Sequence, residues 1–167
     1  FTDLKKCENL LDVGAGGGSF LLKLKEFWWS KLSKNLEAQE ISTHCVDYLK
    51  EKDFKTHQGD FNKIKFEKQY DIVTAWHVLE HIRDVNGFAK QIAKITKKYF
   101  IVEVPMASGK NNGYGRNPNT HEDGFNGHFH FFTEESMKHL FKDCFKSSTT
   151  NEAIQGGEHS LQIIFEK

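Results

Sequence analysis

The stretch NLLDVGAGGGSF, residues 9–20, determines the fold that we predict. Its apolar part, residues 10–13, suits a strand that is buried on both faces. Three glycines then follow at alternate positions, Gly14, Gly16 and Gly18. Glycine permits positive φ and lets the backbone approach a ligand closely, and the helix predicted to begin near Ser19 directs its free amides toward the same point. The pattern indicates a nucleotide-like ligand or, alternatively, a glycine-rich turn with no ligand.

The length and charge of the chain limit the classes of protein to which it can belong. The chain has 167 residues, of which 38% are hydrophobic, so we expect a single domain over residues 1–167. Basic and acidic residues balance at 23 each, and the lack of a long basic block excludes an obvious nucleic-acid partner. No apolar run reaches the ~18 residues of a membrane helix and no leader precedes the first strand, so we expect a cytoplasmic protein without a membrane span.

The sequence gives little information on the N-terminal start of the domain and on its oligomeric state. The sequence begins at Phe1 without a methionine and reaches its first strand by about residue 9, so we expect that an N-terminal segment, such as a cap, is missing. The sequence does not indicate an oligomeric state.

Residues 106–129 form the one long stretch without periodicity and are rich in Gly and Asn, which is typical of a functional loop and predicts a lid.

Strand and helix patterns alternate along the rest of the chain. Helices are predicted after the glycine turn and after two capping residues, Asp84 and Thr133. Strands are predicted at residues 42–48, 55–59, 70–76 and 99–104, followed by a hairpin of residues 145–154 and 160–166. We therefore predict an α/β fold, a Rossmann-like three-layer sandwich whose mostly parallel seven-stranded sheet ends in an antiparallel hairpin.

Polar residues at the carboxyl ends of the predicted strands are the candidate ligand contacts. Asp12, Asp47, Asp60 and the segment after Trp76 would meet in one crevice, because parallel strands end at the same edge of a sheet. A carboxylate such as Asp47 can accept hydrogen bonds from both hydroxyls of a ribose, or it can cap a turn. Asp60 and Phe61 would contact an adenine amino group and stack on its ring.

Together these residues resemble the class I S-adenosylmethionine-dependent methyltransferases. LLDVGAGGGSF resembles the family's first motif, and Asp47 is similar to the acid that binds ribose hydroxyls. YDIVTAWHVLEHIRDV resembles the fourth-strand segment of the subgroup that includes ubiquinone-biosynthesis and other small-metabolite methyltransferases, and GHFHFFTEESMKHLF resembles the entry to its penultimate helix. Asp47 lies 29 residues after Gly18, more than the ~20 expected, so we predict an insertion within residues 30–41.

The resemblance implies an enzyme that transfers the methyl group of S-adenosylmethionine to a small-molecule acceptor, at oxygen. The residues it implies for cofactor binding are Asp12, Gly14, Gly16, Gly18, Asp47, Asp60, Phe61 and Trp76. A hydroxyl acceptor requires loss of a proton, and imidazole suits that step near neutral pH. His81 and His128 are the expected catalytic residues, with His130 and Glu103 as further candidates. Each histidine can equally be a hydrogen-bonded structural residue.

Three alternatives use the same residues. Residues 77–81 match H-x-x-E-H, an inverted zinc-protease motif, but no downstream ligand stands in a recognisable motif, so we expect no metal. An NAD-dependent dehydrogenase shares the glycine turn, although it generally needs a second domain for its substrate and no terminal hairpin. A noncatalytic cofactor-binding module would retain the fold without turnover.

Overall fold

The computed structural model describes residues 6–27, 35–105, 128–155 and 158–167. Its strands are β1 (Leu10–Val13), β2 (Leu36–Glu40), β3 (Lys55–Gln58), β4 (Tyr70–Trp76), β5 (Thr96–Pro105), β6 (Ser147–Gln155) and β7 (Glu158–Glu166). Its helices are α1 (Ser19–Phe27), α2 (Thr43–Glu51), α3 (Val85–Ile95) and α4 (Glu134–Phe141), with short 3₁₀ helices η3 (Phe61–Lys63) and η4 (Leu79–His81). Residues 106–127, most of the predicted lid, lie outside the described residues.

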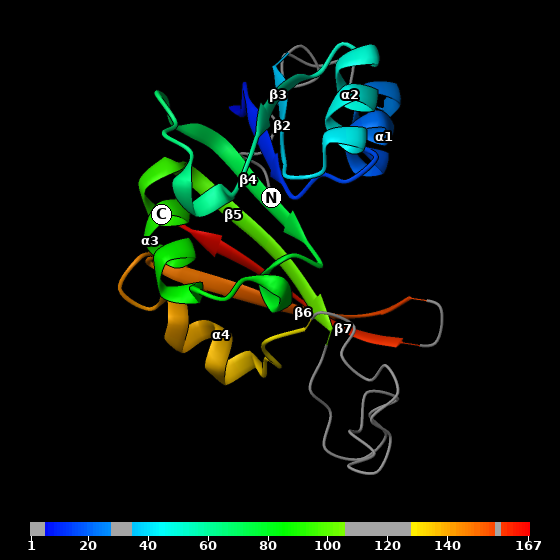
Figure 1. The fold of residues 1–167 in the computed structure, drawn as a ribbon. Helices are drawn as coiled ribbons and strands as arrows, with labels where there is room; N and C mark the ends of the chain where they lie inside the picture. Colours follow the sequence, from blue (N-terminus) through cyan, green and yellow to red (C-terminus); the bar gives the residue numbers. More distant parts are fainter. Residues whose placement is uncertain (1–5, 28–34, 106–127, 156–157) are drawn as a thin grey trace.

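The seven strands form one sheet in the order β3-β2-β1-β4-β5-β7-β6 (Figure 1). Neighbouring strands from β3 to β5 pair in parallel, whereas β7 pairs antiparallel with both β5 and β6. The strand order reverses between β1 and β4, which are adjacent in the sheet. Ligands of open α/β sheets bind outside the carboxyl ends of the strands at such a switch point.

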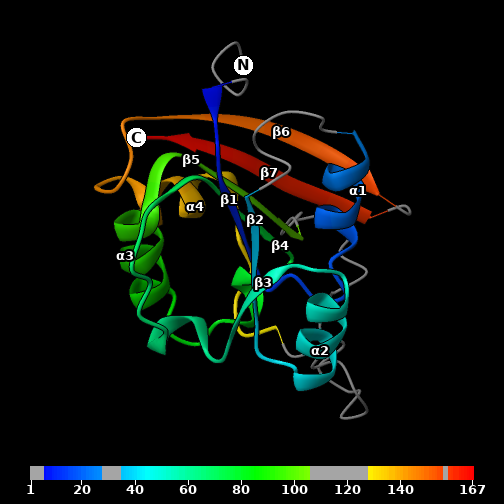
Figure 2. The same ribbon diagram turned by 90° about the horizontal axis from the view of Figure 1, so that it is seen from above.

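Helices cover both faces of the sheet, as predicted. Figure 2 shows α1 and α2 on one side of the sheet and α3 and α4 on the other. Alternate residues of β1 supply the two cores: Leu10 packs in a cluster with Leu21 and Leu49 of the first helix pair. Leu11 belongs to a larger cluster with Phe88 of α3 and with α4. The predicted three-layer sandwich with its terminal hairpin is confirmed.

Local signals in the sequence placed several elements correctly. Strand β4 has the predicted bounds, and β5 begins three residues before the predicted position 99. The carboxylate of Asp84 accepts a hydrogen bond from the Gly87 amide and caps α3. Thr133 and Ser136 form a reciprocal capping box at α4. Both helices therefore begin at the predicted capping residues.

The strand predicted at residues 42–48 is wrong. These residues lie in α2 and the turn before it, and β2 is the earlier segment LEAQE. Val46 and Leu49 are the buried residues of α2, at the i, i+3 spacing of one helix face. LEAQE has no β-branched or aromatic residue, yet all five of its residues are buried. Pairing with β1 and β3 thus outweighs weak strand propensity.

Candidate active site

The glycine turn after β1 leaves open space at Gly16 and Gly17 but not at Gly14 or Gly18. Gly14, Gly16 and Gly18 all have positive φ, at 65°, 53° and 73°. A Cβ atom on Gly14 would lie 2.5 Å from Val78, and one on Gly18 would lie 2.6 Å from Leu49, so these two glycines permit close packing. A Cβ on Gly16 would meet no atom within 4 Å. The turn therefore presents its backbone to open space at Gly16, as a ligand cradle requires.

Glu40, the last residue of β2, holds this turn. One carboxylate oxygen accepts a hydrogen bond from the Gly16 amide at 2.8 Å, and the other accepts from the amides of Ile41 and Ser42, also at 2.8 Å. The residue is 7% exposed and lies next to the switch point. Glu40 is thus the acid at the end of the second strand, and the sequence analysis missed it.

Asp47 does not lie at a strand end. It is an exposed residue of α2, so the placement on which its ribose contact was predicted is absent. Glu40 follows Gly18 by 22 residues, close to the ~20 of dinucleotide-binding units. The predicted insertion is therefore unnecessary. The exposed side chain of Ile41 directly follows β2 and offers an apolar face beside Glu40.

Asp60 and Phe61 follow β3 and differ in exposure. The Asp60 carboxylate accepts from the Asn62 amide at 3.1 Å, lies 3.3 Å from the Lys63 ammonium and is partly exposed. The ring of Phe61 is only 3% exposed and packs against Phe88, with 4.8 Å between ring centroids. The ring thus belongs to the core, and this placement does not favour the predicted stacking on adenine.

Asp12 and Trp76 lie near the carboxyl ends of the two central strands, β1 and β4. Asp12 is buried and accepts a hydrogen bond from the Thr74 hydroxyl at 2.6 Å. Burial raises the pKa of Asp12 to about 7, against the effect of the Thr74 hydrogen bond, and the nearby Glu40 charge adds to the increase. Trp76 packs on Phe20, and its buried indole Nε1 has no hydrogen-bond partner among the described residues. Both stay candidate cofactor contacts.

Beyond β4, two buried carboxylates flank one histidine. His77 has a positive φ of 53°, and its Nε2 lies 3.2 Å from Glu103 of β5. Its Nδ1 lies 3.5 Å from Glu80, an ion-pair contact too long for a well-formed hydrogen bond. The Glu80 carboxylate raises the pKa of His77 above its ordinary value, burial opposes this, and Glu103 adds to the increase. Sequence reasoning did not single out His77 as a functional residue by itself.

The structure brings His81 and His128 together, although 46 residues separate them. Their rings meet edge to face with 4.6 Å between centroids. The amides of Phe129 and His130 donate to the Glu80 carbonyl at 2.7 and 3.3 Å, which fixes one segment against the other. The Nε2 atom of His130 is buried and has no hydrogen-bond partner among the described residues. The two expected catalytic residues, His81 and His128, are thus in contact with each other.

These features form a site that fits a nucleoside cofactor on one side and an acceptor on the other. The open backbone at Gly16, the carboxylate of Glu40 and the apolar Ile41 lie at the ends of β1 and β2. The histidines lie beyond the end of β4, across the switch point. An acid beside a glycine turn suits ribose hydroxyls, and the open position at Gly16 leaves room for the cofactor.

A comparison with known families gives the same assignment. Residues 1–144 match the family described as a methyltransferase domain. The chain belongs to this family. It is a class I S-adenosylmethionine-dependent methyltransferase, and the resemblance seen in the sequence is confirmed. Its cofactor is S-adenosylmethionine, which supplies an electrophilic methyl group when bound.

Individual relatives are distant. A methyltransferase, the ubiquinone biosynthesis O-methyltransferase of Rickettsia canadensis, is 29% identical over 99 residues, or 58% of this chain. That match spans 41% of the relative, so the chain covers well under half of its length. The magnesium protoporphyrin IX methyltransferase of Synechocystis with bound SAH has a TM-score of 0.73 at 16% identity, covering 96% of this chain and 74% of that one.

A second solved structure supports the same fold. The methyltransferase of Thermotoga maritima described as a possible histamine N-methyltransferase has a TM-score of 0.74 at 17% identity, covering 95% of this chain and 82% of that one. The fold argues against the two alternative enzymes. The sheet ends in an antiparallel hairpin, unlike that of a dehydrogenase. In the H-x-x-E-H segment, His77 precedes η4 and its ring turns to Glu103, so the two histidines do not share a helix face.

No helix in the described part of the chain is both long enough and apolar enough to cross a membrane.

Proposed function

We propose that this methyltransferase domain transfers the methyl group of S-adenosylmethionine to a hydroxyl oxygen of a small-molecule acceptor. The observation that carries the proposal is the pair of histidines, His81 and His128, across the switch point from the open glycine turn. Attack by a hydroxyl requires removal of its proton, and imidazole nitrogen performs such transfers near neutral pH. The name of the Rickettsia relative, an O-methyltransferase, favours the same acceptor atom.

In this proposal the cofactor lies over the glycine turn. Glu40 accepts hydrogen bonds from the ribose hydroxyls, and Ile41 lies against the adenine ring. Asp60 accepts from the adenine amino group, since its carboxylate is partly exposed at the end of β3. Gly14 and Gly18 keep the turn tight, and Gly16 leaves room for the ligand. Asp12 and Trp76, near the ends of β1 and β4, line the buried side of the cofactor site. Asp47 has no part in it.

The acceptor would occupy the side of the crevice that carries His81, His128 and the exposed ring of Phe131. The two histidines handle the hydroxyl proton, as single imidazoles or together with Glu80. Positioning contributes the rest, because holding the reacting atoms ~3–3.5 Å apart in line lowers the barrier by several kcal/mol. A noncatalytic module is the other candidate, and only turnover separates it from the enzyme.

The test measures production of S-adenosylhomocysteine with paired acceptors that differ only in the nucleophile, such as a phenol and the corresponding aniline. We expect turnover with hydroxyl acceptors and a methyl ether as product. His81→Ala and His128→Ala should lower turnover by roughly 10²- to 10⁴-fold while S-adenosylhomocysteine affinity changes by only a few-fold. His44→Ala, on the exposed face of α2, is the matched control.

Two results would contradict the proposal. Methylation of amines but not of hydroxyls would identify the protein as an N-methyltransferase instead. Cofactor binding without turnover on any acceptor would favour the noncatalytic module.

A further inference from the structure

A group of potential metal ligands lies beside the acceptor side of the crevice. A carboxylate oxygen of Glu80 and one ring nitrogen each of His81 and His128 all lie within 4.8 Å of one another. Two of the residues come from η4 and the third from the segment before α4. The backbone hydrogen bond from the Phe129 amide to the Glu80 carbonyl, at 2.7 Å, holds these segments together. The group is therefore positioned by main-chain contacts as well as by its side chains.

Glu80 is the unusual member of this group. Its side chain is 1% exposed, and neither carboxylate oxygen has a hydrogen-bond partner among the described residues. Burying a carboxylate without a partner is costly, and buried charges are otherwise paired or coordinate metals. The arrangement indicates that something further contacts this carboxylate when the protein is functional.

His77 is insufficient as that contact. Its ring lies between Glu80 and Glu103, and the Glu103 contact is the shorter, at 3.2 Å against 3.5 Å. Glu103 is itself buried, and its second oxygen accepts from the neutral amide of Gln162 at 3.1 Å. Two carboxylates thus share one histidine, so even a positively charged His77 balances only one of them. The Glu80 carboxylate therefore still lacks a hydrogen-bond partner among the described residues, and the ring nitrogens of His81 and His128 lie within 4.8 Å of it.

We propose that Glu80, His81 and His128 bind a divalent transition-metal ion of the Zn²⁺ type. One carboxylate and two imidazoles form a donor set that such ions prefer. Ligand atoms around a tetrahedral ion with bonds of about 2.1 Å lie roughly 3.4 Å apart. The present separations, all within 4.8 Å, exceed that value by at most about 1.4 Å, which side-chain rotations can close. Three protein ligands leave one coordination position open, as in catalytic sites.

Metal binding would refine the acceptor class, and this step rests on the proposed function. With the ion bound, the two imidazoles serve as ligands and no longer accept the hydroxyl proton themselves. A hydroxyl oxygen in the open position instead loses its proton to solvent, because the ion stabilises the oxyanion. The oxygen lone pair then forms the new O–C bond, while the S–C bond breaks and its electron pair remains on sulfur. Acceptors with a hydroxyl that is able to coordinate the ion would be the preferred substrates. From the sequence we expected no metal, because His128 was not recognisable as a downstream ligand.

The experiment titrates tag-free, chelator-treated protein with Co²⁺ and Zn²⁺, without cofactor or acceptor. Calorimetry gives stoichiometry and affinity, and the visible absorption of bound Co²⁺ reports its coordination. We expect one ion per chain. Glu80→Gln, which preserves size, and His128→Ala should each weaken binding by at least about tenfold, since even an outer-shell partner contributes 10- to 100-fold. The control variant His44→Ala also removes an exposed histidine but lies outside the proposed site, so it should leave the affinity for the metal ion unchanged.

Circular dichroism and S-adenosylhomocysteine binding show whether each variant is folded. A folded Glu80→Gln variant that binds Co²⁺ as tightly as the unsubstituted protein would overturn the proposal, and so would equal losses in His44→Ala. Failure to detect a bound ion at high concentrations of Co²⁺ and Zn²⁺ would also overturn it. Because the titration involves no methyl transfer, its failure leaves the proposed reaction standing, and absence of turnover leaves the metal site standing.

Discussion

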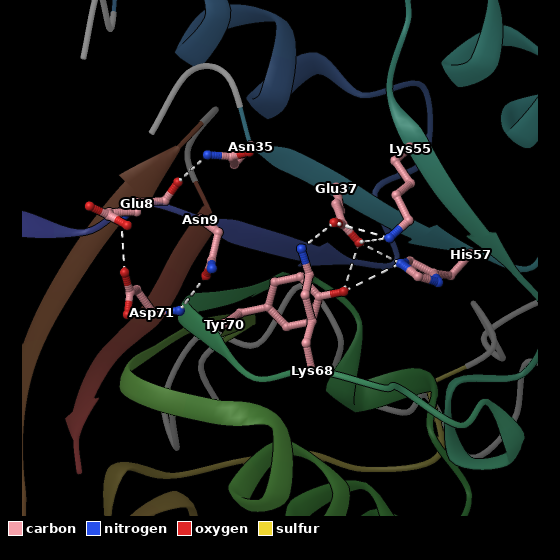
Figure 3. A network of polar contacts seen from close by, with 9 residues as sticks. All are labelled: Glu8, Asn9, Asn35, Glu37, Lys55, His57, Lys68, Tyr70 and Asp71. Carbon is pink, nitrogen blue, oxygen red and sulfur yellow. Dashed lines mark hydrogen bonds and ion pairs between the residues drawn. The ribbon is translucent and has the colours of Figure 1, made fainter. Parts of the chain in front are cut away.

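The two ends of the parallel sheet treat buried carboxylates in opposite ways. At the amino end, Glu37 is 5% exposed and accepts hydrogen bonds from the Tyr70 hydroxyl at 2.8 Å and from His57 at 2.7 Å (Figure 3). The ammonium groups of Lys55 and Lys68 lie 3.3 and 2.5 Å away. Burial alone raises the pKa of Glu37, but the contacts from His57, Lys68 and Tyr70 outweigh it, so this pKa lies below its ordinary value.

At the carboxyl end, Glu40 accepts from three amides, but several other buried polar groups have far fewer partners. The Glu80 carboxylate has no hydrogen-bond partner among the described residues, and the Asp12 carboxylate accepts from the single hydroxyl of Thr74. The indole nitrogen of Trp76 is also unpartnered in this part of the structure. Unsatisfied buried groups cost stability, so their concentration at one end of the sheet is expected where ligands complete the contacts. We therefore expect the amino end to contribute mainly to stability and the carboxyl end to ligand binding.

The largest expected effect concerns the pH dependence of stability at the carboxyl end. The folded-state pKa of Asp12 is raised to about 7 from 3.8, so folded protein binds the proton more tightly than unfolded protein does. Stability should fall as pH rises from about 4 to about 7, by at most about 1.4 kcal/mol per pH unit, and then level off. Asp12→Asn removes this contribution. Urea denaturation of both proteins across pH 4–8 gives the two slopes.

The comparison fails at this point if the two stability curves run parallel. That result would mean that Asp12 has the same pKa in the folded and the unfolded protein. Its burial would then be compensated by contacts other than the Thr74 hydroxyl.

The same substitution at the two ends gives the second prediction. Glu37→Gln should lower the free energy of unfolding by about 2–3 kcal/mol, because hydrogen bonds to a charged acceptor are lost and two lysines lose their partner. Glu80→Gln should be neutral or stabilising in metal-free protein, since it removes a buried charge without a hydrogen-bond partner among the described residues. Denaturation midpoints with equal m-values measure the difference. Equal destabilisation by both substitutions would remove the distinction between the ends.

The success of sequence reasoning followed the strength of local patterns. The apolar residues of β1 and β4 and the caps Asp84 and Thr133 are local signals, and the structure has those elements where we predicted them. The contact between His81 and His128 joins segments that are far apart in the sequence, so no local pattern predicts it, and the resemblance to a family indicated only the two residues.

The failure at β2 has a physical cause. Glu37, Gln39 and Glu40 are buried strand residues whose polar groups find partners only in the folded sheet, in Tyr70, in the Gly59 carbonyl and in the Gly16 amide. A strand of such composition has the appearance of a solvent-exposed loop in the sequence. The helical spacing of the next segment was misread as a strand for the same reason, since neighbours in space decide between the two structures.

The smallest expected effect is on cofactor affinity, and it tests the corrected acid directly. Glu40→Gln should weaken S-adenosylhomocysteine binding by roughly 10- to 100-fold, because a charge-assisted hydrogen bond contributes about 1.5–3 kcal/mol. Asp47→Asn, the same change of acid to amide on the exposed face of α2, should leave affinity unchanged. Because Glu40 also accepts from the Gly16 amide, calorimetry should be paired with hydrogen exchange at residues 14–18. A weaker affinity with unchanged exchange assigns the loss to the ribose contact, and a loss caused by Asp47→Asn instead would restore the original assignment.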